Sequence, residues 1–393
     1  MNKNATNSAK MKLDNRRLLL ELLRKKPLSR AELARRTGLT RAAVTLIAEE
    51  LIKEGLLLES GTMEADFGRK PVLLDIRGES RICGGINLSR NGYAVGLTDL
   101  KGKLMSKAKL PLTGEKDWRN ELVRITGALE DLLKEADLEA DNLIGLGISS
   151  PGPVDLNAGI ILNPPNFNVW HQAGIVEALR KRLKLPVYLE NNASALALAE
   201  KNYGSGEGFE SFIELVVDTG IGAGIILKEA LYRGVGGYGS EVGHTSVNMF
   251  GQRCSCGNRG CLELYASIPA ILDCFSRQGG KEASWQEVVD QAMEGNPLGI
   301  DTIGTESAFL AQGIVNTMNI LELEAVIVAG NITYRPELLL SGIRERVEEA
   351  SITRSNRKPQ ILASSLGDDG DIVSAAAVVI ERFFRGDIPQ KAF

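Results

Sequence analysis

Residues 244–263, HTSVNMFGQRCSCGNRGCLE, gather three of the chain's five cysteines within eight residues, and the first of these lies ten residues after a histidine. His244, Cys254, Cys256 and Cys261 would supply one imidazole and three thiolates, the donor set of a closed four-coordinate structural zinc site. A disulfide explains the pattern less well, because the cysteines are odd in number and Cys254 and Cys256 are too close in sequence to bridge easily. We therefore predict a structural zinc ion held by these four residues.

The length and charge of the chain suggest several domains, one of them basic. A chain of 393 residues exceeds the usual size of a single core, so we expect two or three domains. No apolar run approaches the roughly 20 residues of a membrane span, and the N-terminus lacks the apolar core of a secretory signal. We therefore expect a cytoplasmic protein with no membrane partner. Although the net charge is −4, residues 1–50 hold twelve Lys and Arg against five Asp and Glu. Local positive charge of this kind is typical of a nucleic-acid-binding module.

Three helices are predicted in this basic segment. Residues 29–38 begin with a capping box and end at a glycine, and residues 40–55 are capped by Thr40 and also end at a glycine. Two short helices joined by a tight turn form a helix-turn-helix. A longer helix over residues 14–26 precedes them, and its expected inward face consists of Leu18, Leu19, Leu22 and Leu23.

The second helix of such a pair enters the major groove of DNA with its N-terminal residues. We expect Arg41 to be the main base reader, within a contact set of Thr40, Arg41, Ala42 and Thr45. Two strand-like runs follow and predict a hairpin wing, in which Arg69 and Lys70 would meet DNA. A basic three-helix bundle that binds protein is the alternative, since charge runs are often solvated faces. Spacing, wing and charge together favour a winged helix-turn-helix, an α+β domain over residues 1–75.

The remaining residues carry α/β patterning. From Arg81 onward, apolar strands alternate with glycine turns and with an amphipathic helix over residues 120–136. The pattern is compatible with two similar α/β halves. Residues 218–227, DTGIGAGIIL, join two strands through glycines, which suits close approach to a phosphate. Glycines in such a hairpin can equally serve the turn itself.

Five motifs occur in an order that closely resembles the ROK family of repressors, uncharacterised frames and sugar kinases: SSPGPVD, ENNASALALAE, DTGIGAGI, SEVGH and CSCGNRGCLE. The resemblance covers essentially the whole chain, and the cysteine motif is its most specific element. It implies the N-terminal winged helix of the repressor branch, which includes xylose-repressor-like proteins. It also implies a two-lobed α/β sugar-kinase domain of the actin-like ATPase fold. We expect one lobe at residues 76–195, completed by a C-terminal helix at 371–386, and the zinc-bearing lobe at 196–370.

A sugar ligand between the two lobes follows from the same resemblance. Amide and carboxylate side chains offer the donors and acceptors that suit vicinal hydroxyls. His244 would serve both as a zinc ligand and as a sugar contact. For each asparagine, turn formation or helix capping is the alternative role. The positions that match the family's sugar contacts are Asn166, Asn191, Asn192, Glu241, His244 and Glu263.

Two features depart from the family's kinases. Those kinases carry the catalytic-base aspartate where this chain has Asn192, and an amide cannot take the proton of a sugar hydroxyl. In the first phosphate loop, an aspartate and glycines are replaced by Asn87, Ser89 and Arg90, which would crowd a phosphate and leave no carboxylate for magnesium. We therefore expect neither a catalytic residue nor ATP and Mg²⁺ as cofactors.

The second phosphate loop is intact and is interpreted as vestigial, which leaves weak nucleotide binding open. Its residues are Asp218, Thr219, Gly220, Gly222 and Gly224.

These features together predict a sugar-responsive, DNA-binding transcriptional regulator, most simply a repressor, whose kinase-like domain senses a monosaccharide. We expect a homo-oligomer, dimer or tetramer, on operator DNA, because two-fold symmetry matches paired half-sites. One alternative is an active kinase for glucose, mannose or N-acetylglucosamine with a regulatory N-terminal domain. Another is an architectural DNA binder without a sugar ligand.

Overall fold

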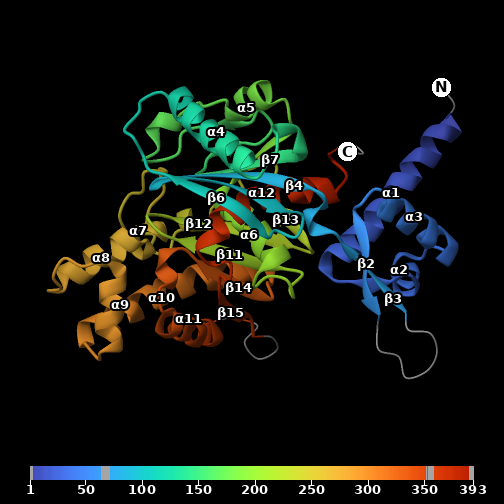
Figure 1. Ribbon diagram of the computed structural model, residues 1–393. Coiled ribbons are helices and arrows are strands. Elements are labelled where there is room, and N and C mark those ends of the chain that lie inside the picture. Colours follow the sequence, from blue (N-terminus) through green and yellow to red (C-terminus); the bar gives the residue numbers. More distant parts are fainter. Residues whose placement is uncertain (1–2, 63–70, 351, 353–357, 389–393) are drawn as a thin grey trace. The chain divides into compact units, whose positions relative to one another are not determined.

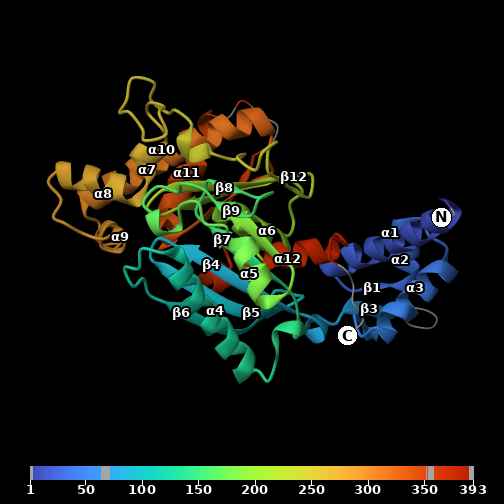
Figure 2. The same cartoon turned by 90° about the horizontal axis from the view of Figure 1, so that it is seen from above.

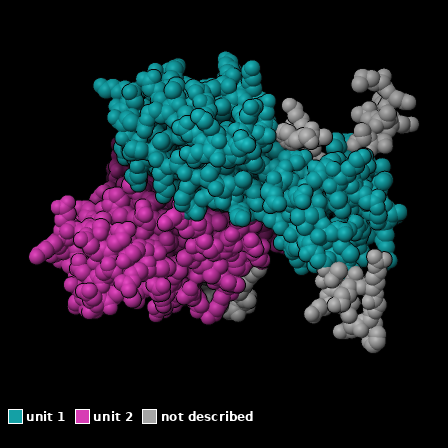
Figure 3. Space-filling model, in the orientation of Figure 1, with its two compact units in different colours: residues 1–191, 369–393 teal, residues 192–368 magenta. Residues whose placement is uncertain are grey.

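The computed structural model describes residues 3–62, 71–350, 352 and 358–388. The chain divides into two compact units, teal and magenta in Figure 3: unit 1 consists of residues 1–191 with 369–393, and unit 2 of residues 192–368. Among the described residues, no helix is long and apolar enough to cross a membrane.

Unit 1 begins with a winged helix (Figure 1). Its three strands form an antiparallel sheet in the order β1-β3-β2. The capping box of Ser29 and Glu32 opens α2, and Gly38 ends that helix in the left-handed conformation, as predicted. The wing residues Arg69 and Lys70 lie outside the described residues. The elements are α1 (Lys3–Lys25), β1 (Leu28–Ser29), α2 (Arg30–Thr37), α3 (Arg41–Lys53), β2 (Leu57–Thr62) and β3 (Val72–Ile76).

The core of the winged helix corrects one prediction. Leu19, Leu20 and Leu23 of α1 are buried, whereas Leu18 is 42% exposed, so the predicted inward face is wrong at Leu18. A run of adjacent leucines is compatible with more than one helical face, and packing of α1 against α2 and β3 selects the buried one. The remaining core positions include Leu33, Val44, Ile47 and Leu51, which are all buried.

The rest of unit 1 is a five-stranded sheet in the order β10-β7-β4-β5-β6. Strands β4, β7 and β10 are parallel, and β4, β5 and β6 form an antiparallel meander. Helices α4 and α5 lie above this sheet in Figure 1, and α12 lies below it. The strands are β4 (Ile82–Ser89), β5 (Gly92–Asp99), β6 (Leu104–Leu110), β7 (Leu143–Ser150) and β10 (Val187–Asn191), and the helices are α4 (Trp118–Glu135), α5 (Ile175–Leu183) and α12 (Gly370–Phe384).

Short elements complete unit 1. Strands β8 (Val154–Asp155) and β9 (Ile160–Ile161) form a small hairpin. The single-turn 3₁₀ helices are η1 (Gly78–Ser80), η2 (Ala140–Asn142) and η3 (Asn168–Trp170), and η6 (Gly367–Asp369) precedes α12.

Helix α12 packs close to the sheet because the strands that it contacts carry glycines. A Cβ atom at Gly85 of β4 would lie 2.7 Å from the Ile372 carbonyl oxygen, and one at Gly147 of β7 would collide with the Ala375 carbonyl. Residues Ala375, Ala376 and Ala377 are fully buried. Small residues on both sides therefore allow backbone-to-backbone packing, which fixes α12 tightly on β4 and β7.

Unit 2 has a second five-stranded sheet, in the order β13-β12-β11-β14-β15. Helix α6 covers one face, where Gly224 packs against Ala193 and Ala197, and α7 to α11 build the main apolar core with the other. The strands are β11 (Phe212–Val217), β12 (Ile221–Leu227), β13 (Ala230–Tyr232), β14 (Ala325–Ala329) and β15 (Gln360–Ala363). The helices are α6 (Asn192–Tyr203), η4 (Val242–His244), α7 (Glu263–Ala266), α8 (Ile268–Arg277), α9 (Trp285–Met293), α10 (Pro297–Leu321), η5 (Asn331–Thr333) and α11 (Glu337–Ala350).

The two sheets share one topology. In each, the first three strands form an antiparallel meander, a fourth strand joins the first in parallel, and a fifth joins the fourth in parallel, both through helical crossovers. This repeat confirms the predicted pair of similar α/β halves.

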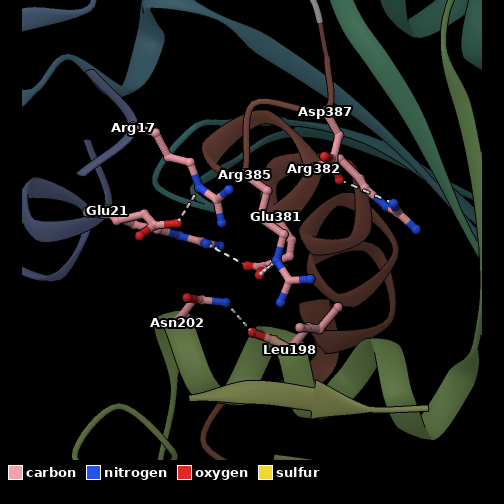
Figure 4. Close-up of polar contacts among 9 residues, drawn as sticks. Arg17, Glu21, Leu198, Asn202, Glu381, Arg382, Arg385 and Asp387 are labelled. Carbon is pink, nitrogen blue, oxygen red and sulfur yellow. Dashed lines mark hydrogen bonds and ion pairs between the residues drawn. The ribbon is translucent and has the colours of Figure 1, made fainter. Parts of the chain in front are cut away.

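The winged helix is attached to the rest of unit 1 by a buried ion pair. Arg24 of α1 donates from Nη1 to Glu381 Oε2 of α12 at 2.6 Å, and the two side chains are only 11% and 14% exposed. The Arg24 guanidinium also lies 4.7 Å from the centre of the Phe384 ring. Figure 4 shows Arg385 reaching the same carboxylate, with Nε 2.7 Å from Oε1. Seen from above in Figure 2, α12 runs toward α1.

Charge balance explains why this carboxylate can stay ionised. Burial by itself would raise the pKa of Glu381, but the Arg24 and Arg385 guanidinium groups outweigh it and hold the pKa below the ordinary value. A second link joins the two parts at the surface, where Lys101 Nζ lies 2.7 Å from Asp75 Oδ2.

Replacing Glu381 with leucine should destabilise the protein by about 3 kcal/mol, because removal of one partner leaves a buried charge uncompensated. Combining Glu381→Leu with Arg24→Met should recover most of that loss in denaturant unfolding. The matched control is Arg17→Met, which breaks the exposed Arg17–Glu21 pair and should cost below about 0.5 kcal/mol. Additive effects of Arg24→Met and Glu381→Leu would contradict a coupled pair.

Two glutamates are buried in unit 2 without a hydrogen-bonding partner among the described residues. Glu214 of β11 and Glu306 of α10 are both fully buried. Desolvation raises the pKa of each carboxyl well above the ordinary value, and at Glu214 the charge of Glu200 adds to the effect. Burial therefore favours the neutral form of both carboxyl groups.

Replacing Glu306 with glutamine should flatten the dependence of stability on pH. A raised folded-state pKa contributes stability that is present below about pH 4.5 and is lost as the pH rises toward the folded-state value. Each pH unit in that window costs about 1.4 kcal/mol. Thermal unfolding at pH 4 and pH 8 should show a gain for Glu306→Gln only at pH 8. The exposed-site control Glu282→Gln should show no such difference, and an equal gain at both pH values would refute the assignment.

Candidate functional site

The four predicted metal ligands converge in unit 2. The ligand atoms of His244, Cys254, Cys256 and Cys261 all lie within 4.8 Å of one another. His244 Nδ1 is 3.7 Å from Cys254 Sγ, and Cys256 Sγ is 3.7 Å from Cys261 Sγ. Metal–sulfur bonds of about 2.3 Å in a tetrahedral zinc site give edges of roughly 3.8 Å. The donor set and its spacing therefore fit a four-coordinate zinc site.

Hydrogen bonds from side chains to the backbone stabilise this cluster. The His244 carbonyl accepts from Asn258 Nδ2 at 3.1 Å and from Cys261 Sγ at 3.4 Å. Gly260, with a φ of 64°, packs against the Asn248 backbone, where a Cβ atom would collide. A glycine is therefore required just before the last cysteine. The loop from His244 to Cys261 is held by these protein contacts in addition to the predicted metal site.

The six predicted sugar contacts are divided between the units. Unit 2 carries Asn192 at the start of α6, Glu241 and His244 beside η4, and Glu263 at the start of α7. Because Nδ1 of His244 faces the cysteines, its other ring nitrogen, Nε2, is the one that can face a ligand. Glu241 is exposed as a whole residue, yet desolvation of its carboxyl raises the pKa, with His244 acting in the opposite sense and Glu263 in the same one.

Unit 1 carries the other two predicted contacts. Asn191 ends β10, and its Nδ2 lies so close to Gly152 that a Cβ atom there would be 2.6 Å away. Asn166 has a φ of 56°, in the left-handed region that asparagine tolerates, and it is exposed. Arg90 Nε donates to the Pro165 carbonyl at 2.9 Å and so anchors the loop just before Asn166.

The residues at the position of the first phosphate loop, which are Asn87, Ser89 and Arg90, are engaged in protein contacts. Asn87 is buried and donates from Nδ2 to Ser149 Oγ at 2.9 Å. Ser89 closes the β4–β5 turn, since its hydroxyl donates to the Gly92 carbonyl at 2.9 Å. Together with the Arg90–Pro165 bond, these contacts engage the side chains of all three residues within the protein.

The second loop is the turn between β11 and β12, and its polar groups also have protein partners. The Asp218 carboxylate accepts from the Asn331 backbone N–H at 2.7 Å, and Glu263 Oε2 accepts from the Ile221 N–H at 2.9 Å. A Cβ atom at Gly220 would lie 2.5 Å from Glu263 Oε2. Close packing against protein thus accounts for the glycines at 220 and 224, while Thr219 is exposed.

The described part of the predicted DNA-contacting set lies at the start of α3. Thr40 caps this helix, with Oγ1 accepting from the Ala43 N–H at 3.1 Å. Arg41 and Ala42 are exposed and Thr45 is half-buried. The predicted DNA-contacting set does not include Arg35 and Arg36, which are exposed in the last turn of α2. Their adjacency just before the turn of the helix-turn-helix is the signal that could have found them.

A winged helix joined to a kinase-like α/β fold defines a class: DNA-binding proteins built on a sugar-kinase scaffold. The family model "ROK family" matches residues 83–382, and the model "Winged helix-turn-helix DNA-binding" matches residues 15–57. The chain therefore belongs to the ROK family, and the predicted fold is confirmed.

Individual relatives separate the regulators from the kinases. The xylose repressor of Bacillus spizizenii is 31% identical over 372 residues, which cover 95% of this chain and 96% of that protein. A solved ROK-family transcriptional regulator, described as a homologue of the E. coli MLC protein, aligns over 97% of this chain and 99% of its own, with a TM-score of 0.83 and 27% identity. The glucokinase of Thermotoga maritima is 32% identical but covers 76% of this chain and 97% of its own. The two regulators thus match nearly the whole chain, including its winged helix.

Proposed function

We propose that this protein is a sugar-responsive transcriptional repressor in which a former kinase pocket serves as a sensor. The observation that carries the proposal is one chain that combines a winged helix with a ROK domain. From its resemblance to the family, we assign Asn192 to the position of the kinases' catalytic aspartate. An amide there can bind a sugar hydroxyl but cannot remove its proton.

The proposed ligand is a monosaccharide. The amides of Asn166, Asn191 and Asn192 would donate to and accept from its hydroxyls, and the carboxylates of Glu241 and Glu263 would accept from them. Because the xylose repressor is a full-length relative, xylose is the first candidate, with glucose and N-acetylglucosamine next.

We also propose that the cluster of His244, Cys254, Cys256 and Cys261 holds a structural zinc ion. The bound ion would fix the loop that carries His244. Its ligand Cys261 lies two residues before Glu263 in the sequence. With all four positions filled by protein, it would leave no open position for substrate water.

The response to sugar requires a route to the winged helix. Asn191 ends β10 and Asn87 lies on β4, and α12 packs on the same sheet before it contacts Arg24 of α1. We propose that a ligand held at the end of this sheet changes the packing of α12, and that α12 carries this change to the winged helix. A homo-oligomer, most simply a dimer, would place two α3 helices on paired half-sites in the cytoplasm.

The decisive experiment measures thermal unfolding and operator binding of the full-length protein against a panel of sugars, with DNA obtained by in vitro selection. One sugar should stabilise the protein and change its DNA affinity at least tenfold, in either direction, while ATP with magnesium changes neither. Asn192→Ala should weaken the response to that sugar about tenfold through loss of its hydrogen bonds, and leave sugar-free DNA binding intact. Formation of sugar phosphate in a coupled assay would instead favour the kinase alternative.

Removal of zinc should destabilise the ROK domain and leave the winged helix folded. Cys256→Ser should lower the zinc content from one ion per chain toward zero, reduce the Tm and weaken sugar binding. Cys274→Ser is the matched control, since Cys274 lies outside the cluster. Metal analysis that finds no zinc in the wild-type protein purified without chelator would refute the assignment.

A further inference from the structure

The outward face of α3 carries an apolar patch formed by Ala42, Thr45 and Leu46. Leu46 is 59% exposed, and Ala42 is exposed beside it. The inward face is already filled by Val44 and Ile47, so the fold does not use Leu46 as a core residue. Positions i, i+3 and i+4 of a helix are neighbours, so these three side chains form one continuous surface.

Thr45 presents its methyl group rather than its hydroxyl as a free contact. Its Oγ1 donates to the Arg41 carbonyl at 2.9 Å, one turn back along the helix. The hydroxyl is thus already bonded within α3. The patch consequently offers methyl groups from all three of its side chains.

The surroundings indicate which partner this face meets. Arg41, which directly precedes Ala42, is an exposed cation beside the patch, and Arg35 and Arg36 are exposed in the last turn of α2, just before the turn that leads to α3. A polyanion complements this positive charge. Glu49, one turn beyond Thr45, is exposed and places a negative charge at the far end of the patch. A phosphate backbone would avoid that carboxylate, so the first two turns of α3 are the part suited to enter the groove.

We propose that Ala42, Thr45 and Leu46 determine sequence specificity by packing against the 5-methyl groups of thymines, beside a guanine read by Arg41. In the major groove the thymine methyl is the one apolar base edge, whereas guanine offers O6 and N7 to an arginine fork. The operator half-site therefore contains a guanine followed closely by at least two thymines on one or both strands. This inference rests on the proposed function and names the bases that α3 recognises.

The test uses in vitro selection with the full-length protein, followed by binding assays on the selected duplex. Replacing the contacted thymines with uracil removes only the methyl groups. Affinity should fall about three- to fivefold for each contacted thymine, as expected for loss of one buried methyl. Uracil at positions outside the guanine-flanking run is the control and should change affinity less than twofold.

Variants assign the methyl contact to Leu46. Leu46→Ala should lose most of the sensitivity to uracil, whereas Arg41→Ala should keep it and lose the preference for guanine. Leu112→Ala removes a leucine that is 48% exposed elsewhere on the chain, and it should bind as wild type does. Because Leu46 is exposed, Leu46→Ala should keep the wild-type Tm, which separates loss of contact from loss of fold.

The outcomes distinguish this inference from the proposed function. Specific binding that is unchanged by uracil and by Leu46→Ala would overturn the thymine assignment and leave the repressor function standing. Absence of any selected sequence would overturn both. Loss of self-association in Leu46→Ala with unchanged DNA contacts would assign the patch to a protein interface and overturn the inference.

Discussion

The close packing of α12 on β4 and β7 is the constraint on which unit 1 depends. Glycines at 85 and 147 bring the helix backbone against the strands, and no larger residue fits at either position without displacing it. The same helix then ends against α1, where Glu381 binds Arg24. A C-terminal segment thus completes a fold begun some 300 residues earlier, and it attaches the DNA-binding module to the sensor domain's sheet. Because tightly packed elements move as units, this helix would carry the proposed communication between the two.

Conversion of a kinase scaffold into a sensor requires few changes, because binding and catalysis depend on different properties of the same residues. A sugar hydroxyl needs a hydrogen-bonding partner, which Asn192 would still provide in the proposed site, whereas phosphoryl transfer also needs a base and a phosphate cradle. In the first loop, Asn87, Ser89 and Arg90 make contacts that stabilise the protein instead. In the second, Asp218 and Glu263 bond to backbone N–H groups. Both loops are thus held in place by contacts within the protein, although we propose that they no longer serve phosphoryl transfer.

The sequence predicted local features best. Helix caps at Ser29 and Thr40 were readable because each depends on residues within three positions, and the metal-ligand set was readable because thiolates and imidazole have few other reasons to cluster. It misjudged Leu18, since a run of leucines does not say which face the neighbouring elements will cover. It also gave no warning that Glu214 and Glu306 are buried, because a charged residue type is ordinarily expected at the surface.

By itself the sequence determined the class: a basic helix-turn-helix, a repeated α/β pattern and a four-ligand knuckle, all encoded in spacing along the chain. Tertiary structure alone decided which distant residues meet. The Arg24–Glu381 pair spans 357 positions, and the fixing of Arg90 on Pro165 spans 75. Such contacts have no periodic signal, because they depend on how elements pack after they have formed. The exposure of Leu46 is of the same kind: the sequence places a leucine on α3, and only the packed core reveals that its side chain stays exposed.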